Sequence, residues 1–168
     1  MTNIPSWDEL FLRQVYLIAS KSRDPRSKIG SVIVNYNSFD CISQGFNNFA
    51  RNVQDLDERY LDREFKNKII VHSEINSIFN AARKGISTLG CTLFTQIKVC
   101  HNCANAIIQA GIREIVYHKQ ALNLMDNQKW AESQGLADIL LDEAGIFRRY
   151  VDVNLQIETL IDGKLIKV

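Results

Sequence analysis

Apolar residues near the start of the chain recur every three or four positions, from Leu10 to Ile18, which is the spacing of a helix that buries one face. Ser6 stands just before this run as a candidate N-cap, and Glu9 follows three residues later, in the register of a capping box. This pattern predicts an amphipathic helix, which must end before Pro25 because proline disfavours helical backbone at the preceding residue.

Short apolar runs bounded by turn residues follow, and they are typical of buried strands. They predict strands at 29–34, 39–44, 91–97 and 112–117, with a further edge strand at 146–153. Helical spacing returns at 71–84, 100–109 and 131–143, and a glycine stands just after the end of each of these stretches. The tail 157–168 alternates around Asp162-Gly163, a turn pair that predicts a β-hairpin.

Four stretches lack a clear period. Residues 20–28 and 45–58 are interpreted as polar loops, 119–130 as irregular, and 56–70, with charges of mixed sign, as a solvent-facing helix or ordered loop. A helix and two strands followed by strands that alternate with helices predict an α/β layered domain with a mixed sheet. At 168 residues the chain is long enough for one such domain with a core of its own.

The composition narrows the classes of function. Lys and Arg number 20 and Asp and Glu 19, so the net charge of +1 argues against a strongly basic nucleic-acid binder and against an acidic disordered tail. No apolar run approaches the length of a membrane span, and the first residues lack the basic and then apolar order of a signal peptide. We therefore expect a cytoplasmic protein whose four cysteines stay reduced and serve a metal, a reaction or the core.

Two short motifs carry candidate chemistry, and each opens a predicted helix. The first contains His72 and Glu74, and the second contains Cys100 and Cys103. Cysteines three residues apart lie on one face of a helical turn, and the positive end of the helix dipole favours the thiolates that bind zinc. With His72 as third ligand, the fourth position of the metal stays open to water, which is the pattern of a catalytic rather than a structural zinc site.

Glu74 is the candidate proton shuttle of such a site. A carboxylate two residues from a ligand histidine can reach a water on the metal, whose pKa zinc lowers to about 7, and can carry its proton to a leaving amine. Two alternatives stay open: a closed zinc site with Cys41 or Cys91 as fourth ligand, and a redox-active cysteine pair. Otherwise, Cys41 and Cys91 are interpreted as small buried residues, His101 as a surface residue, His118 as exposed or at a pocket mouth, and Trp7 and Trp130 as packing residues.

The two motifs together resemble the H-x-E and C-x-x-C signature of the zinc-dependent cytidine/deoxycytidylate deaminase superfamily. Further stretches are similar to its deoxycytidylate (dCMP) deaminase branch: Ser22-Arg23-Asp24-Pro25, 28–34, Gly45-Phe46-Asn47-Asn48, His72-Ser73-Glu74-Ile75-Asn76-Ser77-Ile78 and 103–112. The similarity covers about residues 7–150. The tail 151–168 has no clear counterpart, and its role stays open.

This resemblance implies a three-layer α/β/α sandwich around a five-stranded mixed sheet, with residues 1–168 forming a single deaminase domain. It also implies that His72, Cys100 and Cys103 hold one catalytic Zn²⁺ ion per chain, that Glu74 moves the protons, and that Asn47 hydrogen-bonds the bound nucleoside. The reaction implied is hydrolytic deamination of dCMP, or of a 5-substituted dCMP, to dUMP and ammonia. Enzymes of this branch are usually homo-oligomers, often hexamers, and many are activated by dCTP and inhibited by dTTP.

The sequence departs from the branch at three points. Val99 replaces the proline before the first cysteine, and Ser73 replaces an alanine, but neither change removes a ligand atom. Gly-Tyr-Asn-Gly becomes Gly45-Phe46-Asn47-Asn48, in a region that helps to form the effector site of the family. The candidate effector residues are therefore Phe46, Asn48 and Arg51, and whether control by dCTP and dTTP is retained stays open.

A nucleotide substrate requires a phosphate anchor. The loop with Ser22, Arg23, Arg26, Ser27 and Lys28 offers hydroxyls and cations before a strand, and Ser22, Arg23 and Lys28 are the predicted anchor, with Arg51 as a further candidate. Other hypotheses remain open. A deaminase of RNA or single-stranded DNA needs a basic groove with stacking aromatics. The others are a deaminase of a free nucleoside or nucleobase, and a zinc-stabilised binding module without activity.

Overall fold

The computed structural model describes residues 4–124 and 128–168. In chain order its elements are α1 (Trp7–Ala19), β1 (Gly30–Asn35), β2 (Asp40–Phe46), α2 (Asp57–Leu61), α3 (Arg63–Ile69), α4 (Ser73–Ala82), β3 (Thr92–Thr95), α5 (His101–Gln109), β4 (Glu114–His118), α6 (Lys119–Asn123), a 3₁₀ turn η1 (Gln128–Trp130), α7 (Ala131–Glu143), β5 (Phe147–Val151), β6 (Glu158–Ile161) and β7 (Lys164–Lys167). Within these ranges, no helix combines the length and the apolar character needed to cross a bilayer.

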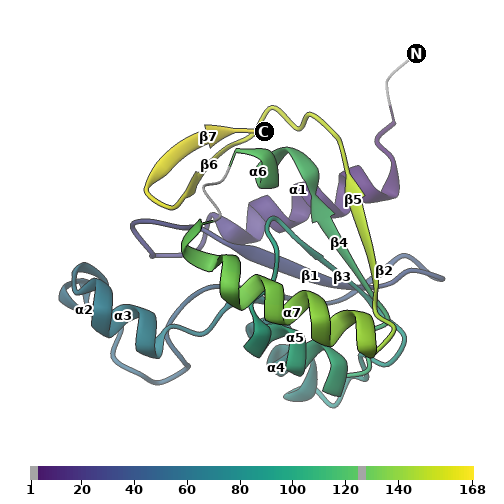
Figure 1. The fold of residues 1–168 in the computed structure, drawn as a ribbon, viewed down its shortest axis with the longest axis horizontal. Coiled ribbons are helices and arrows are strands. Elements are labelled where there is room, and N and C mark those ends of the chain that lie inside the picture. Colours follow the sequence, from purple (N-terminus) through teal and green to yellow (C-terminus); the bar gives the residue numbers. More distant parts are fainter. Residues whose placement is uncertain (1–3, 125–127) are drawn as a thin grey trace.

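Five strands form one sheet in the order β2-β1-β3-β4-β5 (Figure 1). β1 is antiparallel to both β2 and β3, whereas β3, β4 and β5 run parallel. The parallel pairs follow from the helices between them, because α5 and α7 each carry the chain back across the sheet before the next strand begins. The sheet is mixed, as predicted, and 146–153 does supply its edge strand.

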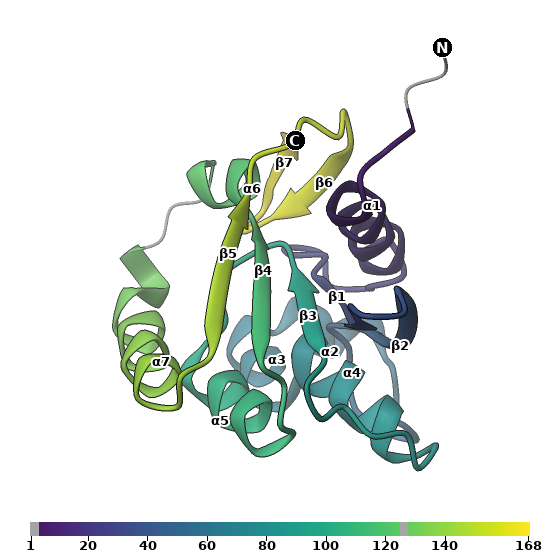
Figure 2. The same ribbon diagram turned by 90° about the vertical axis from the view of Figure 1, so that its right-hand side faces the viewer.

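Helices cover both faces of this sheet. Figure 2 shows α4, α5 and α7 on one side and α1 on the other. Neighbouring side chains of the central strands alternate between the two layers: Ile33 and Leu93 pack with the residues of α5 and α7, and Val32 and Phe94 pack with those of α1. Burial on both faces explains why these strands are continuous apolar runs in the sequence. The three-layer α/β/α prediction is confirmed.

The start of α1 forms only half of the predicted capping box. The Ser6 hydroxyl accepts a hydrogen bond from the Glu9 backbone N–H at 3.1 Å, as an N-cap does. The Glu9 carboxylate does not reach back to the cap, since it pairs instead with the Arg13 guanidinium at 2.8 Å. Arg13 in turn donates to the Leu155 carbonyl at 3.1 Å, so that α1 holds the chain just before the C-terminal hairpin.

The tail forms the predicted hairpin. β6 and β7 pair as a separate two-stranded sheet. Asp162 and Gly163 both have positive φ angles, 49° and 77°, as a two-residue type I′ turn requires. Figure 1 shows the tip of this hairpin on the same side of the molecule as α3 and the beginning of α7.

Two segments differ from their predicted structure. The stretch 119–130 contains α6 and η1, although it was expected to be irregular, and its residues 125–127 lie outside the described part. The charged stretch 56–70 forms two short helices whose Tyr60 and Lys66 side chains are buried. The prediction of a solvent-facing segment is wrong for Lys66, because its amino group pairs with a buried carboxylate far away in the sequence.

Two single-residue predictions are also wrong. His118 is fully buried. Its Nδ1 accepts a hydrogen bond from the Tyr16 hydroxyl at 2.7 Å, and its Nε2 donates one to the Val153 carbonyl at 2.8 Å. These bonds satisfy both ring nitrogens of a neutral imidazole without water. Cys41 is exposed rather than buried, because it lies on β2, which is an edge strand.

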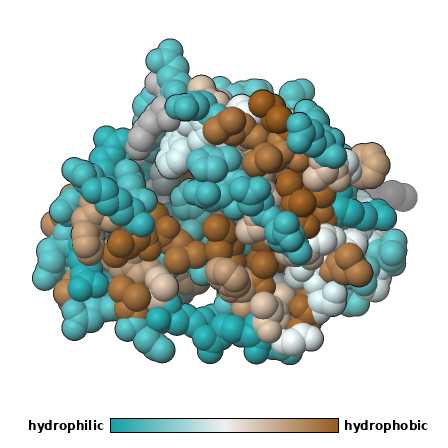
Figure 3. All heavy atoms as spheres, turned by 60° about the horizontal axis from the view of Figure 1, so that its bottom comes forward, coloured by the Kyte–Doolittle hydropathy of each residue, from teal (hydrophilic) through white to brown (hydrophobic). Residues whose placement is uncertain are grey.

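Apolar side chains also reach the surface. Figure 3 shows apolar patches scattered among polar residues on the face that includes the side of α4, α5 and α7. Phe79 of α4 and Leu136 and Ile139 of α7 are each about half exposed or more. Exposed apolar side chains of this kind are common where copies of a chain meet, although single ones also occur on monomers.

Candidate active site

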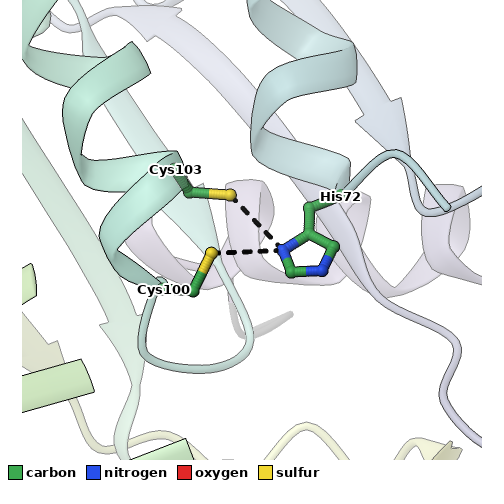
Figure 4. Close-up of side chains that lie close together, drawn as sticks. All are labelled: His72, Cys100 and Cys103. Carbon is green, nitrogen blue, oxygen red and sulfur yellow. Dashed lines mark hydrogen bonds between the residues drawn. The ribbon is translucent and has the colours of Figure 1, made fainter. Parts of the chain in front are cut away.

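Three metal-binding side chains converge where α4 and α5 begin. His72 is the N-cap residue of α4, Cys100 is the N-cap residue of α5, and Cys103 lies in the first turn of α5. The His72 Nδ1 atom lies 3.5 Å from each of the two sulfurs, and one donor atom from each side chain lies within 4.8 Å of the others. Figure 4 shows the imidazole facing both sulfurs. The structure thus brings the three predicted ligands together.

The spacing of these atoms fits a zinc ion. With Zn–N of about 2.0 Å and Zn–S of about 2.3 Å, a tetrahedral ion separates a nitrogen from a sulfur ligand by about 3.5 Å. This value matches both contacts of His72. Cys41 and Cys91 do not belong to this group. Three protein ligands are the number found in catalytic zinc sites, which keep a fourth position open.

The charges of the donor set also suit a cation. A hydrogen bond from Cys103 lowers the pKa of the Cys100 thiol to about 3, so this sulfur is a thiolate at neutral pH. The same hydrogen bond and burial raise the pKa of Cys103. Hydrogen bonding to Cys100 raises the pKa of His72 to about 9. Two adjacent buried thiolates repel each other, so the fully ionised donor set requires a positive ion between its members.

Glu74 lies in the first turn of α4, two residues from His72, and is only 4% exposed. Its Oε2 atom accepts a hydrogen bond from the Ser73 hydroxyl at 3.0 Å. Burial raises the pKa of the Glu74 carboxyl, and the neighbouring His72 opposes this effect. A carboxyl with a raised pKa accepts a proton more readily and can release it again, as general acid–base catalysis requires.

Close packing of α4 against β2 fixes the position of His72 and Glu74. A Cβ atom at Gly45 would lie 2.4 Å from the Ser77 backbone nitrogen and 2.5 Å from the Ser73 carbonyl oxygen, so only glycine fits. Ser31 of β1 donates to the same Ser73 carbonyl at 2.7 Å. The first turn of α4 is therefore held against the sheet by backbone contact and by a buried hydrogen bond.

The donors open into a cavity of about 120 Å³. Its walls come from the loop before β1, α3, the segment before α5, the start of α7 and the tip of the C-terminal hairpin. Its lining residues are Asp24, Arg26, Ser27, Ile29, Asn47, Arg63, Lys66, Asn67, Ile70, His72, Ser73, Glu74, Ile97, Lys98, Cys100, Trp130, Gln134, Ile161 and Asp162. Four of these side chains are cationic, which suits an anionic ligand.

A buried network organises one wall of this cavity. The Lys66 Nζ lies 2.8 Å from the Asp24 carboxylate, and both side chains are almost fully buried. The other carboxylate oxygen of Asp24 accepts from the backbone N–H of Arg26 at 2.8 Å. Asn47 donates to the Ser27 carbonyl at 2.8 Å and accepts from the Ile29 N–H at 2.9 Å. These bonds fix the loop from residue 24 to 29 against α3.

The predicted binding residues occupy different places. Asn47 lines the cavity, whereas Ser22, Arg23 and Lys28 do not. Ser22 is buried and donates to the Asn47 carbonyl at 2.8 Å, and the Lys28 amino group donates to the Ser22 carbonyl. Arg23 pairs with Asp55 and Asp57 at the surface. Their role as phosphate anchor stays a prediction, and the cations that do line the cavity are Arg26, Arg63, Lys66 and Lys98.

The predicted effector residues lie outside this cavity. Phe46 and Arg51 line a separate surface hollow between β2 and α4, and Arg51 donates to Asn80 there. Asn48 accepts from the Tyr60 hydroxyl and forms a backbone bridge with Val71. The effector assignment stays a prediction.

Several lining residues could not be assigned to the site from the sequence, among them Arg63, Lys66 and Trp130. Arg63 and Lys66 belong to the mixed-charge stretch, where nothing in the spacing separates a cavity cation from a solvated one. Trp130 was interpreted as a packing residue, but its ring meets the His72 ring edge-on, with centroids 6.1 Å apart. Only the fold brings these residues to the cavity beside His72, because Arg63 and Lys66 lie on α3 and Trp130 lies on η1, far away in the sequence.

Comparison with known proteins agrees with this geometry. The family model of the cytidine and deoxycytidylate deaminase zinc-binding region matches residues 5–119, which include all three metal donors and Glu74. The chain belongs to this family. The resemblance seen in the sequence is therefore confirmed, and so is the prediction of a zinc-binding deaminase.

Individual relatives of this deaminase are moderately similar. The deoxycytidylate deaminase of Pongo abelii is 30% identical over 152 residues, which cover 86% of this chain and 80% of that protein. The deoxycytidylate deaminase of Enterobacteria phage T4 is 37% identical over 78 residues, which cover 46% of this chain and 39% of that protein. The cyanophage S-TIM5 dCMP deaminase, crystallised with dCMP and dUMP, is 19% identical and superposes with a TM-score of 0.67 over 89% of this chain and 99% of that one. This last similarity shows that the two proteins share a fold.

Proposed function

We propose that this chain is a zinc-dependent deoxycytidylate deaminase, which converts dCMP and water to dUMP and ammonia. The observation that carries the proposal is the convergence of His72, Cys100, Cys103 and the buried Glu74 on a cavity with cationic walls. The relatives named as deoxycytidylate deaminases support the choice of substrate. Residues 1–168 act as one deaminase domain in this proposal.

His72, Cys100 and Cys103 are the proposed ligands of one Zn²⁺ ion. When bound, zinc lowers the pKa of a water molecule to about 7, which makes the water a nucleophile at neutral pH. The two thiolates and the imidazole offset the charge of the ion, and the cavity leaves room for a substrate beside them. The open coordination distinguishes this arrangement from a structural zinc site.

Glu74 carries the protons in the proposed reaction. It takes one proton from the water that adds to C4 of the cytosine ring and delivers it to ring nitrogen N3. It then takes the second proton of the same oxygen and delivers it to the leaving amino group, which departs as ammonia. The C4–N bond breaks as the C4 carbonyl of dUMP forms. A carboxyl with a raised pKa suits both halves of this transfer.

The cationic walls bind the 5′-phosphate in this proposal. Arg26 and Arg63 both line the cavity and carry permanent charge. Asn47 hydrogen-bonds the sugar or base, whereas Ser22 and Lys28 support Asn47 from behind through the bonds described above. Arg23 is not assigned to the phosphate, because its guanidinium pairs with Asp55 and Asp57.

A single nucleotide fits these walls better than the alternatives. A free nucleoside would offer no anionic group to Arg26 and Arg63, which line the cavity. A polynucleotide requires a groove that tracks a backbone, whereas the cations here gather around one cavity. A binding module without activity has no use for a buried carboxyl beside the metal donors. A methyl or hydroxymethyl group on the pyrimidine remains compatible with the proposal.

Assembly and regulation extend the proposal. We infer a cytoplasmic homo-oligomer, for which the exposed apolar residues Phe79, Leu136 and Ile139 offer contact surface. Binding of dCTP or dTTP as effectors is assigned to the hollow lined by Phe46 and Arg51. Analytical ultracentrifugation with and without these nucleotides tests both statements. A monomer would contradict the homo-oligomer, and a sedimentation coefficient that does not change with the nucleotides would contradict the effector assignment.

Ammonia release from a panel of substrates tests the function. Zinc-loaded protein is given dCMP, deoxycytidine, dCTP, 5-methyl-dCMP and a cytosine-containing single-stranded oligonucleotide, each with and without dCTP as effector. The proposal predicts the highest kcat/KM for a monophosphate. A higher value for deoxycytidine or for the oligonucleotide contradicts it, and so does the absence of turnover at one equivalent of zinc.

A further inference from the structure

The C-terminal hairpin is bonded to the loop that forms one wall of the cavity. The backbone N–H of Lys28 donates to the Leu160 carbonyl at 2.8 Å, and that of Gly163 donates to the Arg26 carbonyl at 2.7 Å. The Asp162 N–H donates to the Ser27 hydroxyl at 2.9 Å. The hairpin tip and the loop therefore move as one unit.

The hairpin also belongs to the core. Ile161 and Val168 are almost fully buried, and Val168 exchanges two backbone hydrogen bonds with Ile157. Residues 161 and 162 line the cavity. The family model matches residues 5–119, so this wall lies outside the region that defines the family.

The hairpin tip places a carboxylate among the cavity cations. Lys66 is neutralised by Asp24 in a tight buried pair, and Lys98 pairs with Asp138 at 2.8 Å. Arg26 lies 3.4 Å from the Asp162 carboxylate and 3.3 Å from the Asp162 carbonyl, and both side chains are about two-fifths exposed. The Arg63 side chain has no hydrogen bond or ion pair with any residue in the described ranges. Arg26 and Arg63 are thus the cations most available to a ligand.

Two available arginines suit one phosphate group. A phosphate monoester carries up to two negative charges, and guanidinium groups bind its oxygens in pairs. A second phosphate attached to the first would extend the anion beyond these two cations. The Asp162 carboxylate at the same wall would repel this second phosphate, and repulsion between like charges is an effective way to reject a ligand.

We propose that the tip of the C-terminal hairpin selects nucleoside monophosphates, with Arg26 and Arg63 binding one phosphate and Asp162 rejecting a second. This inference rests on the proposed function and adds its specificity for phosphate number. In this proposal the hairpin stabilises the fold and also determines which nucleotides bind in the cavity.

Binding of dCMP and dCDP to the zinc-loaded Glu74→Gln variant tests this proposal, because without turnover calorimetry measures equilibrium affinity. The decisive variant adds Asp162→Asn. Asparagine tolerates the positive φ angle at this turn, so the hairpin keeps its shape while it loses the charge. The matched control is Glu158→Gln, which removes a carboxylate from an exposed position of the same hairpin that does not line the cavity.

The proposal predicts that dCMP binds at least about tenfold more tightly than dCDP in the Glu74→Gln background. Asp162→Asn should reduce this ratio by about tenfold, a change of about 1.4 kcal/mol. Glu158→Gln should change it by less than about twofold. An unchanged ratio in Asp162→Asn overturns the hairpin proposal alone if the wild-type protein deaminates dCMP. Failure of dCMP to bind or to react overturns the proposed function and this inference with it.

Discussion

Lys66 of α3 donates to Asp24 of the loop before β1, with 2.8 Å between Nζ and Oδ2, and both side chains are almost fully buried. The pair joins a helix to a loop 42 residues earlier in the chain. Removing one partner leaves the other charge buried without compensation, which is far more costly than the loss of an exposed pair. This contact is therefore a support for the cavity wall.

Lys66→Met should lower the free energy of unfolding by about 3 to 5 kcal/mol, because the Asp24 carboxylate then stays buried without its counter-ion. Lys68→Met is the matched control. Lys68 lies on the same helix and pairs with Glu64 in an exposed position, so its replacement should cost less than about 1 kcal/mol. Urea unfolding measures both variants, and equal costs would contradict the assignment.

Gly45→Ala should reduce both stability and turnover. The added Cβ meets the backbone of α4 at 2.4 Å, so the helix that carries Glu74 must shift. Overpacking of this kind costs about 1 to 3 kcal/mol. Gly135→Ala is the control, since no atom lies within 4 Å of its Cβ position and alanine favours a helix interior. The account is contradicted if Gly45→Ala matches the wild type in thermal midpoint and kcat.

The buried His118 should make the protein less stable in mild acid. Burial lowers the pKa of His118 in the folded state, whereas the pKa of a histidine in the unfolded chain is about 6.5. The unfolded state therefore binds the proton first, so stability is present above that pH and is lost as the pH falls toward the lowered pKa. His118→Gln, which does not titrate, should show a smaller decrease in urea midpoint between pH 7.5 and pH 5.5. Equal decreases in variant and wild type would exclude this role.

Arg63→Ala should raise KM for dCMP by about tenfold and leave deoxycytidine turnover unchanged, because Arg63 is assigned to the phosphate. Arg59→Ala provides the comparison. Arg59 belongs to the neighbouring helix, lies over the Phe65 ring and does not line the cavity. A similar rise in KM for both variants, or an equal loss with deoxycytidine, would argue against a phosphate contact.

The sequence predicted those parts of the molecule that depend on local spacing. The strand predicted at 29–34 from its short apolar run is found at 30–35, and the helix predicted at 131–143 from its helical spacing has those bounds. Asp162-Gly163 predicted the hairpin turn from the φ angles it favours. The candidate metal donors could be proposed because Cys100 and Cys103 lie within one helical turn, and the other motif, with His72 and Glu74, also opens a helix.

Residues brought together from distant elements could not be predicted in this way. Lys66 is buried because Asp24 lies opposite it, and His118 because Tyr16 and Val153 satisfy its ring nitrogens. The predicted anchor residues come from a loop that does line the cavity, but only the fold shows that Arg26 and not Arg23 faces it. Sequence spacing does not determine which side of an irregular loop faces inward.

The most direct test compares dUMP formation from dCMP by the zinc-loaded wild-type protein and by Glu74→Gln, with zinc content measured in the same samples. The account predicts one zinc per chain in both proteins and turnover lower by at least about a hundredfold in the variant, since the proton carrier is lost while the metal donors remain. Equal turnover by the two proteins would contradict the role of Glu74. No dUMP from the wild type, with zinc bound, would contradict the account as a whole.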